Sequence, residues 1–293
     1  MRIKESRGER IFNVSNIIFL TALMIAMFYP FYYVLVASVS LPEAIVQNRG
    51  ILYHPLGFTT MAYQKVLDNP MILISYANTL FVVIVGTIIN LFLTSFGAYG
   101  LSRKGLYFRN QLMFLITFTM FFSGGLIPTY LLVKSLGLTD TRWALVIPNA
   151  ISAWNLIIMR TYFLGLPDSL EESAKLEGAN DITILFKIII PISMPIVSVM
   201  VLFYGVAHWN AWFDAMIYLK KRELFPLQLI LREILIISNT DNMMADSADI
   251  NKQSLSEIIK YATIIVATLP ILVLYPFLQK YFVKGVMIGA IKG

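Results

Sequence analysis

The side chains with the most obvious chemistry in this sequence lie inside long apolar stretches, where polar groups are rare. They are Asn149, Trp154, Asn155, His208, Trp209, Asn210 and Trp212. Polar groups in such stretches are functional candidates by default, because hydrocarbon offers them no hydrogen-bond partner. Tryptophan rings stack on the C–H faces of sugars, and Asn and His donate hydrogen bonds to hydroxyls or carboxylates. Together these residue types predict a wet passage for a carbohydrate.

Several of these residues also have a purely structural explanation, which the sequence leaves open. Trp209 and Trp212 are typical of the aromatic belts at membrane–water interfaces. His208 is also explained as a buried packing residue whose hydrogen bonds are satisfied. Asn78 and Asn90, on an earlier apolar stretch, are typical of side chains that hydrogen-bond between neighbouring membrane helices.

Signatures of catalysis and of metal binding are missing from the sequence. It has no G-x-x-x-x-G-K-[ST] phosphate loop, so we expect no ATP hydrolysis by this chain itself. It also lacks a G-x-S-x-G elbow, an H-E-x-x-H pair and any cysteine. Its only histidines are His54 and His208, too few for a histidine-rich metal site. We therefore expect a non-catalytic chain with no metal and no cofactor of its own.

The composition is that of a polytopic membrane protein. Hydrophobic residues make up 58% and charged residues 14% of the chain, and the mean hydropathy is +0.72. Soluble domains average roughly a quarter charged residues. Six stretches are long enough to cross a hydrocarbon core of roughly 30 Å as helices: residues 14–39, 72–101, 111–133, 143–163, 192–212 and 261–282. The predicted fold class is an all-α membrane protein with six transmembrane helices.

The distribution of Lys and Arg predicts the orientation of these spans. An even number of spans places both termini on one side, and basic residues accumulate in short cytoplasmic segments. One side carries Arg2, Lys4, Arg7, Arg10, Arg103, Lys104, Arg109, Arg160, Lys175, Lys187, Lys280, Lys284 and Lys292. Most basic residues of the other side lie in the long connection 213–260, where the rule is weaker. We predict that both termini are cytoplasmic.

The chain divides into two parts without a separate soluble domain. Residues 1–71 hold the first span and an outer loop, and residues 72–293 form the core membrane domain. The outer segments are too short to bury a core alone. One of them contains Lys220, Lys221 and Arg222. These cations suit the attraction of an acidic protein or an anionic sugar, and a solvated surface run of charges explains them equally well.

The connection at about residues 165–191 is polar and acidic where it begins, although it joins two apolar stretches. Asp168 and Glu171 fit a D-x-x-E capping box at the start of a short helix. Gly178 breaks this helix, because glycine adopts positive φ freely. Asn180 and Asp181 then cap a second helix. The pattern indicates a short surface helix that docks in a groove of another protein, or else an ordinary amphipathic loop.

The same connection resembles the cytoplasmic loop of permease subunits of binding-protein-dependent ABC importers. That loop has the pattern E-A-A, three residues, G, nine residues, I-x-L-P. This chain matches it with Glu172, Ser173, Ala174, Gly178, Ile188 and Pro191, with Ser173 and Ile190 replacing an alanine and the leucine. Residues 136–141, the Trp209-Asn210 pair, Pro226-Leu227 and the ending at residues 289–293 are similar to the carbohydrate branch, in particular to its maltose-type second permease. The run from 209 to 214 resembles members that serve alginate and related acidic sugars.

The resemblance implies a type I ABC importer in the bacterial cytoplasmic (inner) membrane. It implies a heterodimer with a second permease subunit, two cytoplasmic ATPases that bind ATP and Mg²⁺, and an extracytoplasmic solute-binding protein. The substrate is then an oligo- or polysaccharide, such as alginate. The family pattern makes Glu172 and Gly178 coupling residues, with Glu171, Ser173 and Ala174 beside them. It also suggests that residues 284–293 reach the ATPase interface. Membrane lipid is expected around the chain, and nucleic acid is not expected as a partner.

Two other functions are weaker fits to the sequence. An ion-coupled secondary sugar transporter needs acidic residues in the middle of its spans, and here the carboxylates fall at span ends and in loops. An integral membrane enzyme needs a clustered catalytic set. The only candidate is His208 with Asp214, and residues six apart are poorly aligned on a helix.

Overall fold

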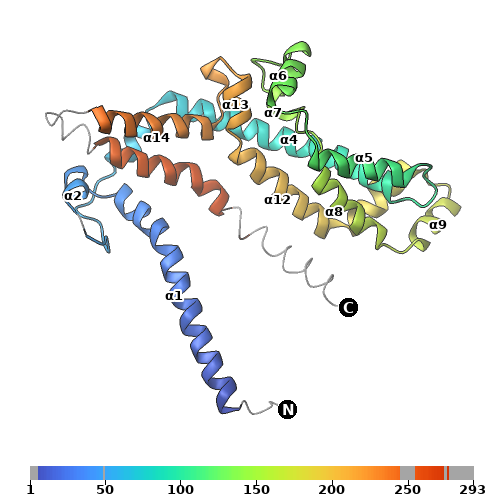
Figure 1. Cartoon of the computed structure of the whole chain (residues 1–293), viewed down its shortest axis with the longest axis horizontal. Coiled ribbons are helices and arrows are strands. Elements are labelled where there is room, and N and C mark those ends of the chain that lie inside the picture. The colour runs from blue at the N-terminus through green and yellow to red at the C-terminus, as the bar shows by residue number, and fades with distance from the viewer. Residues whose placement is uncertain (1–5, 49, 245–254, 274–275, 277–293) are drawn as a thin grey trace. The chain divides into compact units, whose positions relative to one another are not determined.

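A computed structural model describes residues 6–48, 50–244, 255–273 and 276, and the regular elements among them are all helical (Figure 1). The all-helical prediction is therefore confirmed for the described residues. The chain forms two compact units, one from Met1–Asn69 with Glu233–Thr268 and one from Pro70–Arg232 with Leu269–Gly293. Helices α14 (Leu227–Met244) and Leu255–Val273 each contribute to both units.

The first unit contains α1 (Arg7–Ser38), α2 (Pro42–Gln47) and α3 (Met61–Leu67). A capping box between Ser6 and Glu9 begins α1, where each side chain bonds the backbone N–H of the other residue. Most of this long helix exposes apolar side chains, as a helix surrounded by hydrocarbon does. Its last turn is buried, and the Ser38 hydroxyl hydrogen-bonds the Tyr63 hydroxyl of α3 at 2.7 Å.

The second unit is built around α4 (Pro70–Ser102). Helices α8 (Ala153–Leu164) and α12 (Met194–Asn210) both pack against it (Figure 1). An extensive apolar core joins these helices to the segment that precedes α12, and it includes Ala98, Leu156, Met159, Phe163, Ile184, Leu185 and Met200. Because α4 also buries several Asn, Ser and Thr side chains, it is the helix that supplies polar partners to its neighbours.

The structure contains three helices that are long and apolar enough to cross a membrane, or five if each of two bent pairs counts as one span. The three are Arg7–Ser38, Pro70–Ser102 and Leu255–Val273. Only the described residues enter this count, and the prediction of six spans with cytoplasmic termini stays a prediction. The last predicted span, 261–282, runs beyond the described residues.

One of the two bent pairs interrupts a span that the sequence predicted as continuous, 111–133, and the other bends next to Ile192, where the predicted span 192–212 begins. Helices α5 (Arg109–Phe121) and α6 (Leu126–Ser135) meet at 112° around Gly125, whose φ of +85° is available to glycine at no steric cost. The run Asp181–Ile192 meets α12 at 87°. This run comprises α10 (Asp181–Ile184), a π-helical turn at Leu185–Ile189 and α11 (Ile190–Ile192).

The predicted continuous span at residues 143–163 is wrong. Helix α7 (Trp143–Val146) ends after one turn, and α8 begins only at Ala153. Pro148 contributes to the break, because proline has no N–H to donate to the helix ladder. Residues 147–152 between the two helices are called the unwound segment below.

The connection 213–260 is largely helical where the structure describes it. It contains α13 (Phe213–Tyr218), a 3₁₀ turn at Arg222–Leu224 and α14. Tyr218 of α13 packs with Val133 of α6 and Ala144 of α7. The loop at Asp140 is joined to this region as well, because the Asp140 N–H donates to the Tyr218 carbonyl at 3.0 Å.

Candidate functional site

The connection that the sequence singled out forms α9 (Ser169–Leu176) followed by a tight turn. Gly178 has a φ of +82°, as predicted for the residue that ends this helix. The Asn180 side chain caps the next helix by accepting a hydrogen bond from the Thr183 N–H at 2.8 Å, so this predicted cap is also confirmed. The glycine turn and the second cap therefore follow from local sequence chemistry.

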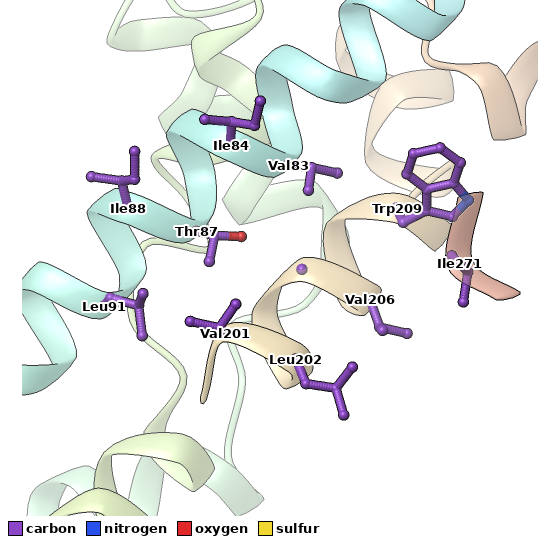
Figure 2. A pocket seen from close by; sticks show the side chains of 11 residues that line it. Val83, Ile84, Thr87, Ile88, Leu91, Val201, Leu202, Val206, Trp209 and Ile271 are labelled. Carbon is purple, nitrogen blue, oxygen red and sulfur yellow. The ribbon is translucent and has the colours of Figure 1, made fainter. Parts of the chain in front are cut away.

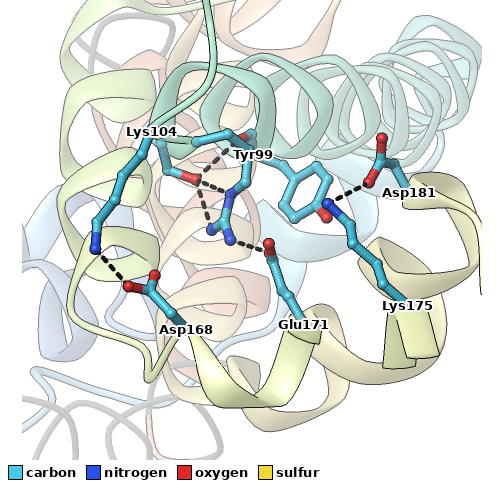
Figure 3. Close-up of polar contacts among 8 residues, drawn as sticks. Tyr99, Lys104, Asp168, Glu171, Lys175 and Asp181 are labelled. Carbon is cyan, nitrogen blue, oxygen red and sulfur yellow. Dashed lines mark hydrogen bonds and ion pairs between the residues drawn. The ribbon is translucent and has the colours of Figure 1, made fainter. Parts of the chain in front are cut away.

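The predicted capping box between Asp168 and Glu171 is wrong. Asp168 makes no side-chain cap bond to α9, because its φ and ψ of −61° and −30° are helical and not the extended values of a capping residue. Its carboxylate pairs with Lys104 instead, and Glu171 pairs with Arg103 (Figure 3). The two cations directly follow α4, so the start of α9 is tied to the end of α4.

The Arg103–Glu171 pair is the more buried of the two ion pairs. The side chains of Arg103 and Glu171 are 23% and 11% exposed, against 79% and 57% for Lys104 and Asp168. The Arg103 guanidinium also lies over the Tyr99 ring, 4.6 Å from its centroid. Burial lowers the pKa of Arg103, while the hydrogen bond from Lys104 lowers the pKa of Asp168.

Helix α9 has an attached face and a free face. Glu171 and Ala174 are buried against the rest of the second unit, whereas Glu172, Ser173 and Gly178 are exposed. The five predicted coupling residues therefore separate into two that hold the helix and three that are accessible. Leu176, which the sequence analysis did not select, is 90% exposed on the free side. Its position four residues after Glu172 on a polar helix face was the available signal.

The unwound segment is held by side chains of α4 and α12. Asn90 donates hydrogen bonds from its amide nitrogen to the carbonyls of Asn149 and Ala150, at 2.7 and 2.8 Å. Because this fixes the amide orientation, its oxygen accepts a hydrogen bond from Nε2 of His208 at 2.6 Å. The Ser152 N–H donates to the Tyr204 hydroxyl at 3.2 Å. The segment's backbone thus finds partners away from water, as membrane depth requires.

The seven residues predicted to line a sugar passage do not form one surface. Asn155, His208 and Trp209 are buried, with exposed fractions of 7%, 7% and 4%. Asn149, Trp154 and Asn210 are exposed and Trp212 is partly exposed. For His208, the Asn90 bond and the close approach of Gly86 favour the structural explanation: a Cβ added to Gly86 would lie 2.6 Å from His208 Nε2. The Trp212 ring lies under the Arg232 guanidinium, at 3.7 Å from the centroid.

The exposed side of the unwound segment opens on a hollow of about 720 Å³. Trp154 stands at this hollow and is 61% exposed. The lining combines α4, α5 and the start of α8, with Gly97, Leu101, Leu115, Ile116, Thr119, Met120, Ile151, Ser152, Ala153 and Leu156. Nearby, the Asn149 amide donates to the Asp214 carboxylate at 2.7 Å. An indole face with hydroxyl groups around it can accept a sugar ring by stacking and hydrogen bonding.

A second cavity, of about 390 Å³, is apolar and lies between α4 and α12 (Figure 2). Trp209 is at one end, so its indole faces a hydrocarbon-like space rather than the hollow at Trp154. Among the described residues of its lining, Thr87 supplies the only hydroxyl, and this hydroxyl is buried without a hydrogen-bond partner. A cavity of this composition does not suit a sugar, whose hydroxyls would be left unpaired.

The basic loop next to α13 is held in place by Asp140. Asp140 has a positive φ of 58° and its carboxylate accepts hydrogen bonds from the N–H groups of Lys220 and Lys221, at 2.5 and 3.2 Å. The bond from Lys220 is the main reason that the pKa of Asp140 is lowered. The side chains of Lys220, Lys221 and Arg222 remain exposed.

Two further predictions concern metal and the chain end. Among the described residues, no group of three or more His, Cys, Asp or Glu side chains is arranged to hold a metal ion. Residues 284–293, predicted to reach the ATPase interface, lie outside the described residues.

Comparisons with known proteins agree on one family. Residues 94–288 match the model described as "Binding-protein-dependent transport system inner membrane component". Over 97% of its length the chain is 44% identical to the polygalacturonan/rhamnogalacturonan transport system permease protein YtcP of Bacillus subtilis (strain 168), covering 99% of that protein. It is 42% identical to Protein LplC of the same organism, over 98% of this chain and 97% of that protein.

A solved structure extends the similarity to three dimensions. It is described as the crystal structure of a bacterial ABC transporter involved in the import of the acidic polysaccharide alginate. One of its chains superposes with a TM-score of 0.87 at 34% identity, covering 96% of this chain and 99% of that chain.

Proposed function

Because this chain belongs to the family of binding-protein-dependent transport system inner membrane components, we propose that it is one permease subunit of an ATP-driven importer of acidic oligo- or polysaccharides. A second permease completes the channel, two cytoplasmic ATPases bind ATP and Mg²⁺, and an external binding protein delivers the sugar. The chain itself hydrolyses nothing. Its termini and α9 face the cytoplasm, as the distribution of basic residues predicts.

The observation that carries this proposal is that α9 is attached on one face and free on the other. Its inner face is fixed to the end of α4 by the Arg103–Glu171 and Lys104–Asp168 pairs. Its free face presents Glu172, Ser173 and the almost fully exposed Leu176. An exposed leucine on a polar surface helix suits the hydrophobic groove of a partner protein. The ATPase would grip this face, and the ion pairs would transmit its movement to α4.

The acidic character of the substrate is supported from two sides. The names of the similar proteins refer to polygalacturonan, rhamnogalacturonan and alginate, which are acidic sugars. In this chain, Asp140 holds the backbone at Lys220 and Lys221 so that both ammonium groups stay exposed. Exposed cations on a fixed backbone raise the local concentration of carboxylates. We place the sugar's path at the hollow beside Trp154, where an indole face is accessible.

Co-purification with the ATPase tests the assignment. The chain is expressed with its partner permease and ATPase, as wild type and with Leu176→Asp or Gly178→Asp, and ATPase stimulation by sugar-loaded binding protein is measured. Both variants are expected to lose the ATPase subunit or its stimulation, because each changes the free face or the turn of α9. Tyr107→Asp is the control, since Tyr107 is 87% exposed in the turn after α4 but lies outside α9.

The outcomes separate the competing functions. Stimulation of the wild type by oligogalacturonate or alginate fragments supports the substrate class as well as the assembly. If the wild type binds no ATPase under any condition, the importer assignment fails and an ion-coupled secondary sugar transporter becomes the better explanation.

A further inference from the structure

The unwound segment lies between two environments. One side is hydrogen-bonded to α4 and α12 through Asn90 and Tyr204. The other side is exposed, with Ile151 at 49% exposure and Trp154, just after the segment, at 61%. The segment has few backbone hydrogen bonds of its own, among them Ile147 N–H to the Trp143 carbonyl and Ala150 N–H to the Ile147 carbonyl, so outside partners are needed to hold it in one conformation. The position of Trp154 in the hollow therefore depends on the residues that bond the segment from behind.

Two residues of α4 carry most of this attachment. Asn90 is fully buried and satisfies two successive carbonyls. Thr94, one turn further along the same face, is also fully buried and hydrogen-bonds the Tyr204 hydroxyl at 2.7 Å. That hydroxyl is the acceptor for the Ser152 N–H. Thr94 thus acts on the segment through Tyr204, and Asn90 acts on it directly.

We propose that Asn90 and Thr94 are positioning residues for the sugar, which fix the unwound segment and so place Trp154 in the hollow. Neither side chain lines the hollow itself. The inference rests on the proposed function, because it takes the hollow as part of the sugar's path. It adds a link between the two functional regions of the chain, since α4 continues from Asn90 to Ser102 without a break and leads directly into Arg103.

This link has a definite length. Arg103 lies thirteen positions after Asn90, which corresponds to about 20 Å along a helix. A helix packed on α8 and α12 moves as a unit over that distance. A displacement of α9 would therefore reach the unwound segment through α4, and the segment would change its presentation of Trp154 when the ATPases close.

A single introduced cysteine tests the positioning role, because the chain has no cysteine of its own. Ile151→Cys places the thiol at the hollow. The full complex, with partner permease, ATPases and binding protein, is treated with a small maleimide in the presence and absence of oligogalacturonate or alginate fragments. At about ten times the half-saturating concentration, sugar should slow labelling about tenfold, because only the unoccupied fraction reacts.

The same measurement is then made in matched variants of α4. Asn90→Ala should reduce the protection by sugar to less than about twofold, because the segment loses its partner for two carbonyls. Asn78→Ala is the control: Asn78 is equally buried on α4 and donates to two carbonyls, but those belong to Glu223 and Phe225, away from the segment. Thr94→Val should also lose protection, and Thr94→Ser, which keeps the hydroxyl, should retain it.

Each result decides a different statement. If sugar still protects Ile151→Cys from labelling after Asn90→Ala or Thr94→Val is added, the positioning role is overturned and the proposed function stays intact. An absence of protection in the otherwise unchanged chain overturns the proposed path, and the positioning role with it. If Asn90→Ala fails to assemble, the comparison of Thr94→Val with Thr94→Ser decides. Loss of sugar protection in Thr94→Val and its retention in Thr94→Ser supports the proposal, and equal protection in both overturns it.

Discussion

The middle of α4 and its C-terminal end are attached to their neighbours in two different ways. In the middle, the fully buried side chains of Asn90 and Thr94 make neutral hydrogen bonds. At the end, Arg103 and Lys104 use ion pairs to Glu171 and Asp168 that are partly or largely exposed. One helix therefore holds the unwound segment with uncharged groups and holds α9 with charged ones.

The difference follows from the solvent at each depth. In hydrocarbon a charge costs several kcal/mol even when it is paired, so a neutral amide is the cheaper way to satisfy two carbonyls. At the water interface desolvation is smaller and charge-assisted bonds are net favourable, although salt screens them. The attachment in the middle should therefore be strong and insensitive to salt or pH, and the attachment at the end weaker and sensitive to both.

The largest effect is expected from Gly86→Ala, in the middle of α4. The new methyl would lie 2.6 Å from His208 Nε2, so His208 must move away from Asn90. Overpacking and a disturbed buried hydrogen bond together should lower the free energy of unfolding by about 3 kcal/mol. The measurement is equilibrium unfolding in mixed micelles. The control is Gly100→Ala, where an added Cβ meets nothing within 4 Å. Equal stability of the two variants would contradict close packing at His208.

A smaller loss is expected from Arg103→Met at the end of α4. This change leaves the Glu171 carboxylate, 11% exposed, without its cation. A fully buried pair would cost roughly 3–5 kcal/mol when one partner is removed, and the partial exposure here reduces the expected loss to about 2 kcal/mol. The double variant Arg103→Met with Glu171→Leu should be more stable than Arg103→Met alone. If it is not, the pair does not carry the attachment of α9.

Local chemistry in the sequence predicted some features of this site and missed others for identifiable reasons. The positive φ of Gly178 and the cap by Asn180 depend only on neighbouring residues, and both were predicted correctly. The capping box at Asp168 did not form, and its carboxylate binds Lys104, 64 residues away in sequence. The attachment of the unwound segment joins residues 59 and 60 apart. A single sequence does not reveal such pairs, and the prediction of a continuous span at residues 143–163 overlooked Pro148, the local signal for the interruption.

An effect of about 1 kcal/mol is expected from Gly178→Ala in the turn that follows α9. Space is not the difficulty, because an added Cβ meets nothing within 4 Å. The cost arises because alanine is strained at a φ of +82°. Gly178→Asn should recover part of the loss, since asparagine tolerates this conformation better than alanine. Measured on the assembled complex, the Ala variant should lower sugar-stimulated ATPase activity while the complex remains folded and assembled. An unchanged ATPase response would show that the turn does not set the position of α9.

The smallest effect is expected from Lys104→Met, because the Lys104–Asp168 pair is largely exposed and such pairs contribute little. Its pH dependence still has a definite sign. The hydrogen bond from Lys104 lowers the pKa of Asp168 in the folded chain, so its stabilisation is complete above the unfolded value near pH 4 and disappears as the pH falls through the lower folded value. The stability difference between wild type and Lys104→Met should be constant from about pH 7 to 5, decline below about pH 4, and vanish once the pH is below the folded pKa of Asp168. Lys104→Arg, which keeps the charge, should follow the wild type. A difference that survives at the acidic end would mean that packing of the Lys104 side chain, and not its charge, holds the start of α9.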